Sequence, residues 1–232
     1  MIDRMTLRLS AVLLGVGFIF YVMVGLLHTG GPANNHTVVF AEYASSASWT
    51  VVHLGQFVGM TVIIAGLLVL YVALGLRAGG AAWLARLGAV SAAVALGLYG
   101  VLQAVDGVAL KQAVDAWARA PEAEKAARFA SAETIRWLEW GIRSYQSFMF
   151  GLTLILLGSA VALTARLPRA FGYLMGLSGL AYLVEGWVLG SEGFSATDTF
   201  AILAGYILIL AWIIWLVVVA WWTKESVRAP TR

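Results

Sequence analysis

Six runs of apolar residues, separated by shorter polar stretches, constrain the fold of this chain more than any other feature. Each run is about 20 residues or longer, which is the length that an α-helix needs to cross a bilayer. Lipid cannot satisfy the hydrogen bonds of an irregular backbone, so each run is predicted to be a helix. The sequence therefore predicts a single all-α, polytopic membrane domain over residues 1–232, with spans near 9–28, 50–76, 84–106, 144–165, 171–190 and 199–222.

Composition agrees with this class of protein, because 61% of the residues are hydrophobic and only 12% are charged. The formal charge of +3 does not indicate a nucleic-acid partner, since the sequence has no cluster of basic residues. The sequence contains no cysteine, which excludes disulfides, thiolate metal sites and thiol nucleophiles. Arg4 and Arg8 precede the first apolar run as in a signal peptide, but no cleavage pattern follows, so this run is predicted to stay as a helix.

The positions of lysine and arginine predict how the chain is threaded through the membrane. With the N-terminus in the cytoplasm, nine of these residues lie on the inner side: Arg4, Arg8, Arg77, Arg86, Arg166, Arg169, Lys224, Arg228 and Arg232. The other six all belong to the segment 105–143, and the outer loops 29–49 and 191–198 contain none. Cytoplasmic loops carry an excess of positive charge, so we expect both termini in the cytoplasm.

The stretch "LYGVLQAVDGVALKQAVDAW", residues 98–117, begins as a membrane span and ends with charges. On a helix, Asp106 falls on the apolar stripe, whereas Lys111 lies on the opposite, solvated face. The bilayer is therefore expected to end near Asp106, and the helix is expected to continue outward as an amphipathic segment until Pro121. The carboxylate of Asp106 is turned toward protein, where it needs a partner. The Ala-rich, charged segment 107–133 is predicted to form two short amphipathic helices over the outer surface, the second beginning at Pro121.

Ionisable residues of the spans gather in the outer half of the predicted bilayer, while the inner half is almost free of them. A charge inside a bilayer is costly, so several at one depth indicate a common role. We expect an outward-facing polar pocket that is walled by the second to fifth spans. Its predicted ligand-binding residues are His53, Gln56, Gln103, Asp106, Glu139, Arg143 and Glu185.

A divalent metal site is an alternative interpretation of the same residues, because imidazole and carboxylate groups suit zinc and similar ions. The predicted metal ligands are His28, His53, Asp106 and Glu185. No HExxH motif supports a metal, so the sequence assigns no cofactor. Haem is less favoured than a metal, because only His28 and His53 come near membrane depth. Retinal is disfavoured, because every lysine lies outside the spans.

A structural interpretation stays open beside both of these. Arg143 can neutralise Asp106 or Glu185, or it can pair with Glu139 on its own helix. Any of these pairs would fix the register of neighbouring helices without a ligand.

Two GxxxG motifs mark faces where helix backbones can approach closely, Gly55 to Gly59 in the second span and Gly172 to Gly176 in the fifth. Such faces can meet helices of the same chain or of another one. A second copy of the chain or another membrane protein is therefore a candidate partner, beside the lipid bilayer and a small molecule or ion.

The stretch "ARLPRAFGYLMGLSGLAYL", residues 165–183, combines an inner "LPR" loop with packing glycines and a tyrosine. In these features the chain resembles a bacterial multi-helix membrane family that is known only as a domain of unknown function. The resemblance implies a helical bundle in the bacterial plasma membrane. It implies no catalytic residues.

These observations lead to three hypotheses of function. The first is a plasma-membrane protein that binds a small ligand or ion in an outward-facing pocket, for sensing or transport. Transport is the less favoured of these two roles, because the inner half of the spans is apolar. The second is a metal-dependent membrane enzyme of the hydrolase type, and the third is a structural or assembly partner of another membrane protein.

Overall fold

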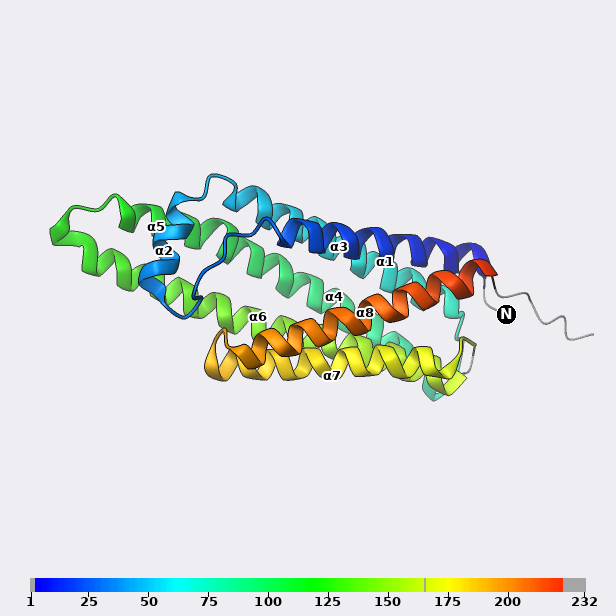
Figure 1. Cartoon of the computed structure of the whole chain (residues 1–232). Coiled ribbons are helices and arrows are strands. Elements are labelled where there is room, and N and C mark those ends of the chain that lie inside the picture. Colours follow the sequence, from blue (N-terminus) through cyan, green and yellow to red (C-terminus); the bar gives the residue numbers. More distant parts are fainter. Residues whose placement is uncertain (1–2, 165, 223–232) are drawn as a thin grey trace, which may run out of the picture.

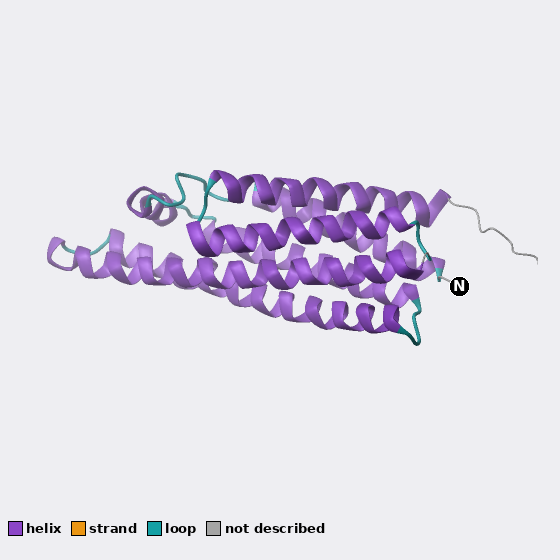
Figure 2. Cartoon of the chain, turned by 90° about the horizontal axis from the view of Figure 1, so that it is seen from below, coloured by secondary structure: helices purple, strands orange, loops and turns teal. Residues whose placement is uncertain are grey.

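The computed structural model describes residues 3–164 and 166–222, and within them the chain is all-α. The elements in order are α1 (Arg4–Gly25), α2 (His36–Ser45), α3 (Trp49–Leu74), α4 (Gly80–Ala104), the π-helix η1 (Val105–Leu110), α5 (Lys111–Ala118), α6 (Glu122–Thr164), α7 (Arg169–Glu192) and α8 (Ala196–Trp222). The α4, η1 and α5 segments form one continuous helix, Gly80–Ala118. Figures 1 and 2 show the long helices side by side in an elongated bundle.

The prediction of six spanning helices is confirmed, because six helices of the described part of the chain are long and apolar enough to cross a membrane. Each predicted span overlaps one of these helices. Three of the nine cations predicted on the inner side lie outside the described residues, namely Lys224, Arg228 and Arg232. Ala165, at the end of the predicted fourth span, also lies outside them.

The segment 107–133 confirms the predicted continuation of the third span to the turn before Pro121, but its second part is not a separate short helix. Its first part continues α4 through η1 and α5, and its second part is the beginning of the 43-residue helix α6. The turn around Arg119–Pro121 is the only interruption of helix in this segment. The Ala-rich sequence after Pro121 contains no residue that stops a helix, so α6 continues from there without a break. At 1.5 Å per residue α6 is about 65 Å long, which exceeds the roughly 30 Å of a hydrocarbon core. The two long helices therefore extend beyond the rest of the bundle as a hairpin (Figure 1).

The helix α2 lies within the segment 29–49, which the sequence analysis treated as a loop. The side chain of Asn35 caps it by accepting a hydrogen bond from the backbone N–H of Val38. Its buried face, which includes Val39 and Phe40, packs with residues of α5 and α6 in a small apolar cluster separate from the main core. This cluster attaches α2 to the hairpin at one end of the bundle (Figure 1).

Three of the four glycines in the GxxxG motifs pack against other helices of the chain, whereas a Cβ atom at Gly176 would meet nothing within 4 Å. A Cβ atom at Gly59 would lie 3.0 Å from the Cα atom of Tyr21 in α1. A Cβ atom at Gly172 would collide with the backbone of α6 at Gly158. Because α1 covers the first motif and α6 covers Gly172, only the surface at Gly176 stays open to another chain on these two faces.

Both ends of the described chain lie at the same end of the bundle. The guanidinium of Arg8 in α1 donates a hydrogen bond from Nε to the carbonyl of Ala220 in α8 (3.1 Å). The loops α3–α4 and α6–α7 also lie there, and Arg166 donates to the carbonyl of Leu74. The opposite end carries α2, α5 and the start of α6 (Figure 1), so the two ends of the molecule have different structures.

Candidate functional site

A cavity of about 520 Å³ lies near the end of the bundle that is remote from the termini. The sequence-predicted residues that line it are His28, Gln56, Gln103, Asp106, Glu139 and Arg143. Two further predicted residues touch this lining from behind: His53 bonds to Asp106, and Glu185 bonds to Arg143. The structure thus brings all eight predicted residues into one neighbourhood, although they come from six different parts of the chain.

The walls of the cavity differ from the prediction that the second to fifth spans form them. The helices α1 and α8 contribute Tyr21 and Tyr206, while no described residue of α7 lines the cavity. The reason is that α7 packs against the other side of α6. A Cβ atom at Gly179 of α7 would lie 2.5 Å from the carbonyl oxygen of Gly151 in α6. This close contact leaves α6 between α7 and the cavity.

The side chains of His53 and Asp106 form a buried pair between α3 and η1. Nε2 of His53 lies 3.0 Å from Oδ2 of Asp106, and the two residues are only 1% and 8% exposed. Nδ1 of His53 lies 2.7 Å from the backbone carbonyl oxygen of Trp49. A carbonyl oxygen can only accept, so Nδ1 carries a proton in this arrangement. Both ring nitrogens therefore face oxygen atoms, and a proton between Nε2 and Oδ2 completes the second hydrogen bond.

The π-helical turn η1 is what places Asp106 beside α3. A π-helix shifts backbone hydrogen bonding from i+4 to i+5 and is often found at functional sites. Here two consecutive carbonyls accept from side chains of α3. Trp49 donates from Nε1 to the carbonyl of Asp106 (2.8 Å), and Thr50 donates from Oγ1 to the carbonyl of Gly107 (3.0 Å). These two bonds fix the start of α3 against η1, so the His53–Asp106 pair is held by backbone as well as by side chains.

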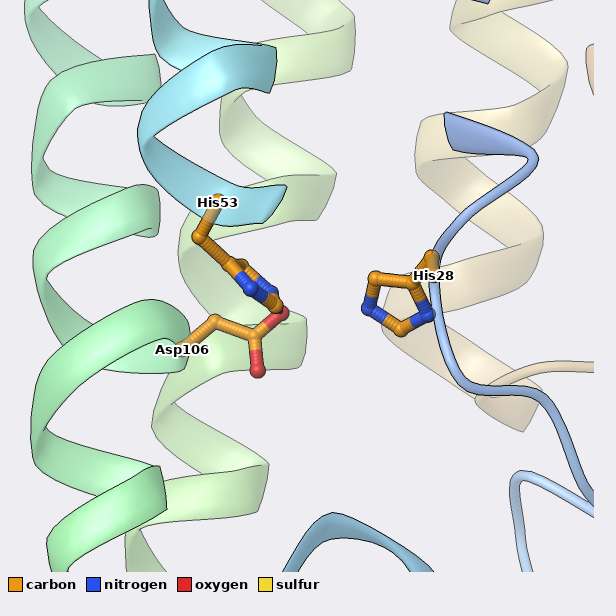
Figure 3. Close-up of side chains that lie close together, drawn as sticks. All are labelled: His28, His53 and Asp106. Carbon is orange, nitrogen blue, oxygen red and sulfur yellow. Dashed lines mark hydrogen bonds and ion pairs between the residues drawn. The ribbon is translucent and has the colours of Figure 1, made fainter. Parts of the chain in front are cut away.

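His28 lies in the loop between α1 and α2 and faces the His53–Asp106 pair from across the cavity (Figure 3). Its ring centroid lies 4.8 Å from the ring of Trp49 and 5.1 Å from the ring of His53. Nδ1 of His28 is 2.8 Å from the carbonyl oxygen of Thr29. Burial lowers the pKa of His28 to about 4, because the charged ring would lose its water, and the ring is therefore neutral near pH 7.

Three of the four predicted metal ligands lie together. One ligand atom each from His28, His53 and Asp106 fall within 4.8 Å of one another. The fourth, Glu185, does not belong to this group, because it lies on α7 behind α6 and pairs with Arg143. Of the described residues, the three that Figure 3 draws are the ones whose chemistry and spacing could hold a metal ion.

The cavity-facing side of α6 carries Arg136, Glu139 and Arg143, spaced three and four residues apart. Nη1 of Arg136 donates to Oε2 of Glu139 at 2.5 Å, and both side chains are almost fully buried. The guanidinium of Arg136 also lies 4.8 Å from the ring centroid of Phe194 and 5.5 Å from that of Tyr43. These rings stabilise a cation that is buried away from water.

Arg143 pairs with Glu185, which is one of the alternatives that the sequence left open. Nε of Arg143 donates to Oε1 of Glu185 at 3.3 Å, and the Glu185 side chain is 1% exposed. The Arg143 side chain is 27% exposed and lines the cavity. Glu139 bonds to Arg136 instead of Arg143, so the i,i+4 pair on α6 is not formed. Arg143 is therefore anchored from behind, with part of its guanidinium left toward the cavity.

Sequence reasoning missed several lining residues, namely Tyr21, Tyr43, Tyr99, Arg136, Phe194 and Tyr206. Arg136 had a detectable signal, because it lies three residues before Glu139 on the same helix face. The three span tyrosines gave no distinct signal, since aromatic residues are common in apolar helices. In the structure Tyr99 donates from its hydroxyl to that of Tyr21 (3.2 Å), at the apolar end of the cavity.

Three buried polar atoms of lining residues have no hydrogen-bond partner within the described part of the chain: Gln103 Oε1, Asp106 Oδ1 and Arg136 Nε. Leaving such a group unpaired in a folded protein costs roughly 1–3 kcal/mol. Three residues of the cavity lining thus each carry an unpaired polar atom, two of them acceptors and one a donor.

The fold and the cavity together define a class of protein, a multi-pass helical bundle with a polar, partly unsatisfied cavity near one end. Comparison with protein-family models, curated proteins and solved structures finds no match to this chain. The function is therefore argued from the geometry of the cavity.

Proposed function

We propose that the chain is an integral protein of a bacterial plasma membrane that binds a small polar ligand or ion in a cavity open to the outside. The six long apolar helices support a membrane location. The lysine and arginine bias supports cytoplasmic termini, and the cavity lies near the other end of the bundle. The positive-inside rule then puts the cavity on the outer side.

One observation carries this proposal: buried ionisable side chains from several helices converge on one cavity, while the main core is apolar. Arg136, Glu139 and Asp106 are each no more than 8% exposed and all line the cavity. Asp106 lies at the end of a predicted span and the other two residues lie just before the fourth one, and burying an ionisable group is costly at any depth. A network needed only for helix register would leave no reason for a cavity between its members, nor for unpaired polar atoms on its walls.

The exposed part of Arg143 indicates that the ligand carries an anionic group. Glu185 holds Nε of this side chain from behind, which leaves the terminal amino groups free to form a fork toward the cavity. Such a fork matches the geometry of a carboxylate or phosphate.

Sensing fits the fold better than transport. Beyond Tyr21 and Tyr99 the bundle is filled by apolar side chains such as Leu67 and Leu70. A transported ion or polar solute would need polar groups along its path through that half.

Small anions provide the test. Tag-free protein in detergent, with chelator present, is heated with increasing concentrations of phosphate, acetate or succinate, and its melting temperature is recorded. A ligand that binds only the folded state raises this temperature with the logarithm of its concentration. We expect at least one of these anions to stabilise the native sequence.

The paired variant Arg143→Gln/Glu185→Gln should abolish this stabilisation. Both charges are removed together, because an unpaired Glu185 would be costly in the core. The matched control is Arg128→Gln/Glu124→Gln, which removes an exposed i,i+4 pair of the same helix α6. Equal stabilisation of both variants, or none in the native protein with any of the anions, would contradict the proposal.

A metal-dependent membrane enzyme remains the second candidate function. The observation that favours it is the approach of His28, His53 and Asp106 at the cavity wall.

A further inference from the structure

The rings of His28 and His53 both use Nδ1 to contact a backbone carbonyl. Nδ1 of His28 contacts the carbonyl oxygen of Thr29 at 2.8 Å, and Nδ1 of His53 contacts that of Trp49 at 2.7 Å. Each contact requires the proton on Nδ1. Nε2 of the neutral His28 ring then keeps a free lone pair, and Nε2 of His53 has one once the proton that it shares with Asp106 leaves. Histidines that bind metals almost always donate their other ring N–H to such a carbonyl or carboxylate.

The carboxylate of Asp106 lies beside the two histidines, and one of its oxygen atoms is unpaired. Oδ2 lies 3.0 Å from Nε2 of His53, whereas Oδ1 is buried and has no partner among the described residues. Asp106 lines the cavity, as does His28. A cation in the space between the three side chains would take the place of the proton between His53 and Asp106.

The spacing is close to that of a bound transition metal. Zinc bonds to nitrogen and oxygen are about 2.0–2.2 Å long, so tetrahedral ligand atoms lie about 3.4 Å apart. The His53–Asp106 separation of 3.0 Å already approaches this value. All three ligand atoms lie within 4.8 Å of one another, so a ligand atom has to move by on the order of 1 Å for all three to bind one ion. His28 can supply this movement, because it lies in a loop, whereas the other two residues are fixed on α3 and η1.

We propose that His28, His53 and Asp106 bind a divalent transition-metal ion of the zinc type, with one coordination position open to the cavity. Two imidazole nitrogens and one carboxylate oxygen form the set of three protein ligands that catalytic zinc sites use, with a water or substrate atom in the fourth position. The inference rests on the proposed function, since it assumes that the cavity is a ligand site, and it names the class of one ligand. It also assigns an open coordination position to which an oxygen atom of a second ligand could bind.

The test uses full-length protein without an affinity tag, stripped with chelator and dialysed, and titrated calorimetrically with Zn²⁺. We expect one ion bound per chain. Titration with Co²⁺ should produce the intense visible absorption of four-coordinate cobalt, which reports the coordination number of the ion and does not depend on any activity.

Two ligand variants and one control decide the outcome. His28→Gln and Asp106→Asn should each weaken Zn²⁺ binding by at least about 100-fold, the upper end of what loss of an outer-sphere partner costs. The control is His36→Gln, because His36 is a half-buried histidine of α2 that pairs with Glu133 away from the cluster. This variant should bind the metal like the native protein.

His28→Gln is the more informative of the two variants, because its loop position makes correct folding the expected result. Size-exclusion chromatography of the stripped protein checks that fold. The inference is overturned if the native protein binds no stoichiometric Zn²⁺, or if folded His28→Gln binds it as tightly as the native chain.

Failure of this inference is distinguishable from failure of the proposed function. The anion titration above is performed in chelator, so it does not depend on the metal. Anion binding without Zn²⁺ binding would refute the metal site and leave the cavity as an anion site. In the converse case the native protein binds Zn²⁺, His28→Gln does not, and no anion stabilises the protein in chelator. This result would support the metal site and refute the metal-independent anion site.

Discussion

A single glycine sets how closely α3 approaches η1. A Cβ atom at Gly107 would lie 2.6 Å from Cβ of His53 and 3.0 Å from its Cγ. Because Cβ of His53 is fixed by the backbone of α3, a side chain at position 107 would push the two elements apart. The smallest residue is therefore required at the point where the His53–Asp106 pair forms.

Gly107→Ala should accordingly destabilise the protein by about 1–3 kcal/mol, the usual range for overpacking. It should also weaken the binding of Zn²⁺, because His53 would move away from Asp106. The matched control is Gly97→Ala on the same continuous helix, where a Cβ atom meets nothing within 4 Å. Thermal unfolding and metal titration of both variants check this expectation, and equal effects of the two substitutions would show that position 107 has no special role.

At the same scale, sequence reasoning located the polar residues but not all of their partners. The depth of Asp106, His53 and Glu185 followed from their positions along the apolar runs. The choice of Glu185 as the partner of Arg143 did not, because it depends on how α6 and α7 rotate about their axes. That rotation is set by contacts between small residues such as Gly151 and Gly179, whose pairing no single sequence reveals.

At the scale of elements, α2 is the helix whose presence affects the cavity most. Its residue Tyr43 lines the cavity, and its ring lies 4.0 Å from that of Trp49 at the start of α3. Its apolar face is attached to the hairpin, as described above. A helix of 10 residues is marginal on its own, so this attachment and the cap at Asn35 hold it in place.

Asn35→Ala should therefore loosen α2, because it removes the acceptor for the Val38 N–H, with a cost of about 1 kcal/mol. Hydrogen exchange followed by mass spectrometry should show faster exchange in residues 36–45. Asn35→Asp should keep the native exchange rate, since aspartate caps helices as well as asparagine does. Unchanged exchange in Asn35→Ala would mean that tertiary packing alone holds α2.

Long elements were predictable and short ones were not, for a physical reason. A run of about 20 apolar residues has one stable structure in lipid, so the six helices followed directly from the sequence. α2 is short and lies in a polar segment, and its signal was limited to the cap at Asn35 and a few apolar residues. The continuation of the third span outward to the turn before Pro121 followed from the amphipathic pattern after Asp106. The union of the segment after Pro121 with the fourth span was missed, because a change of solvent was taken for an end of helix.

At the scale of the whole molecule, the two ends of the bundle differ in charge as well as in structure. One end collects both ends of the described chain and the short loops, together with Arg77, Arg86 and Arg166, while the other carries α2 and the helical hairpin. The loop between α1 and α3 contains no lysine or arginine. This difference is the basis for assigning the cavity to the outside, and it can be tested without knowing the ligand.

Single cysteines provide that test, because the sequence contains none of its own. Ser45→Cys lies at the exposed end of α2, and Ala78→Cys lies in the exposed α3–α4 loop at the other end. Ala78 is preferred to its neighbour Gly79, whose φ of 88° disfavours any side chain. A membrane-impermeant maleimide added to intact spheroplasts should label Ser45→Cys and not Ala78→Cys, whereas inverted vesicles should give the reverse. The opposite labelling pattern would mean that the cavity faces the cytoplasm. Anion and metal binding are measured on purified protein, so they do not depend on this orientation. The pattern would therefore change the side from which the ligand arrives and not the site that binds it.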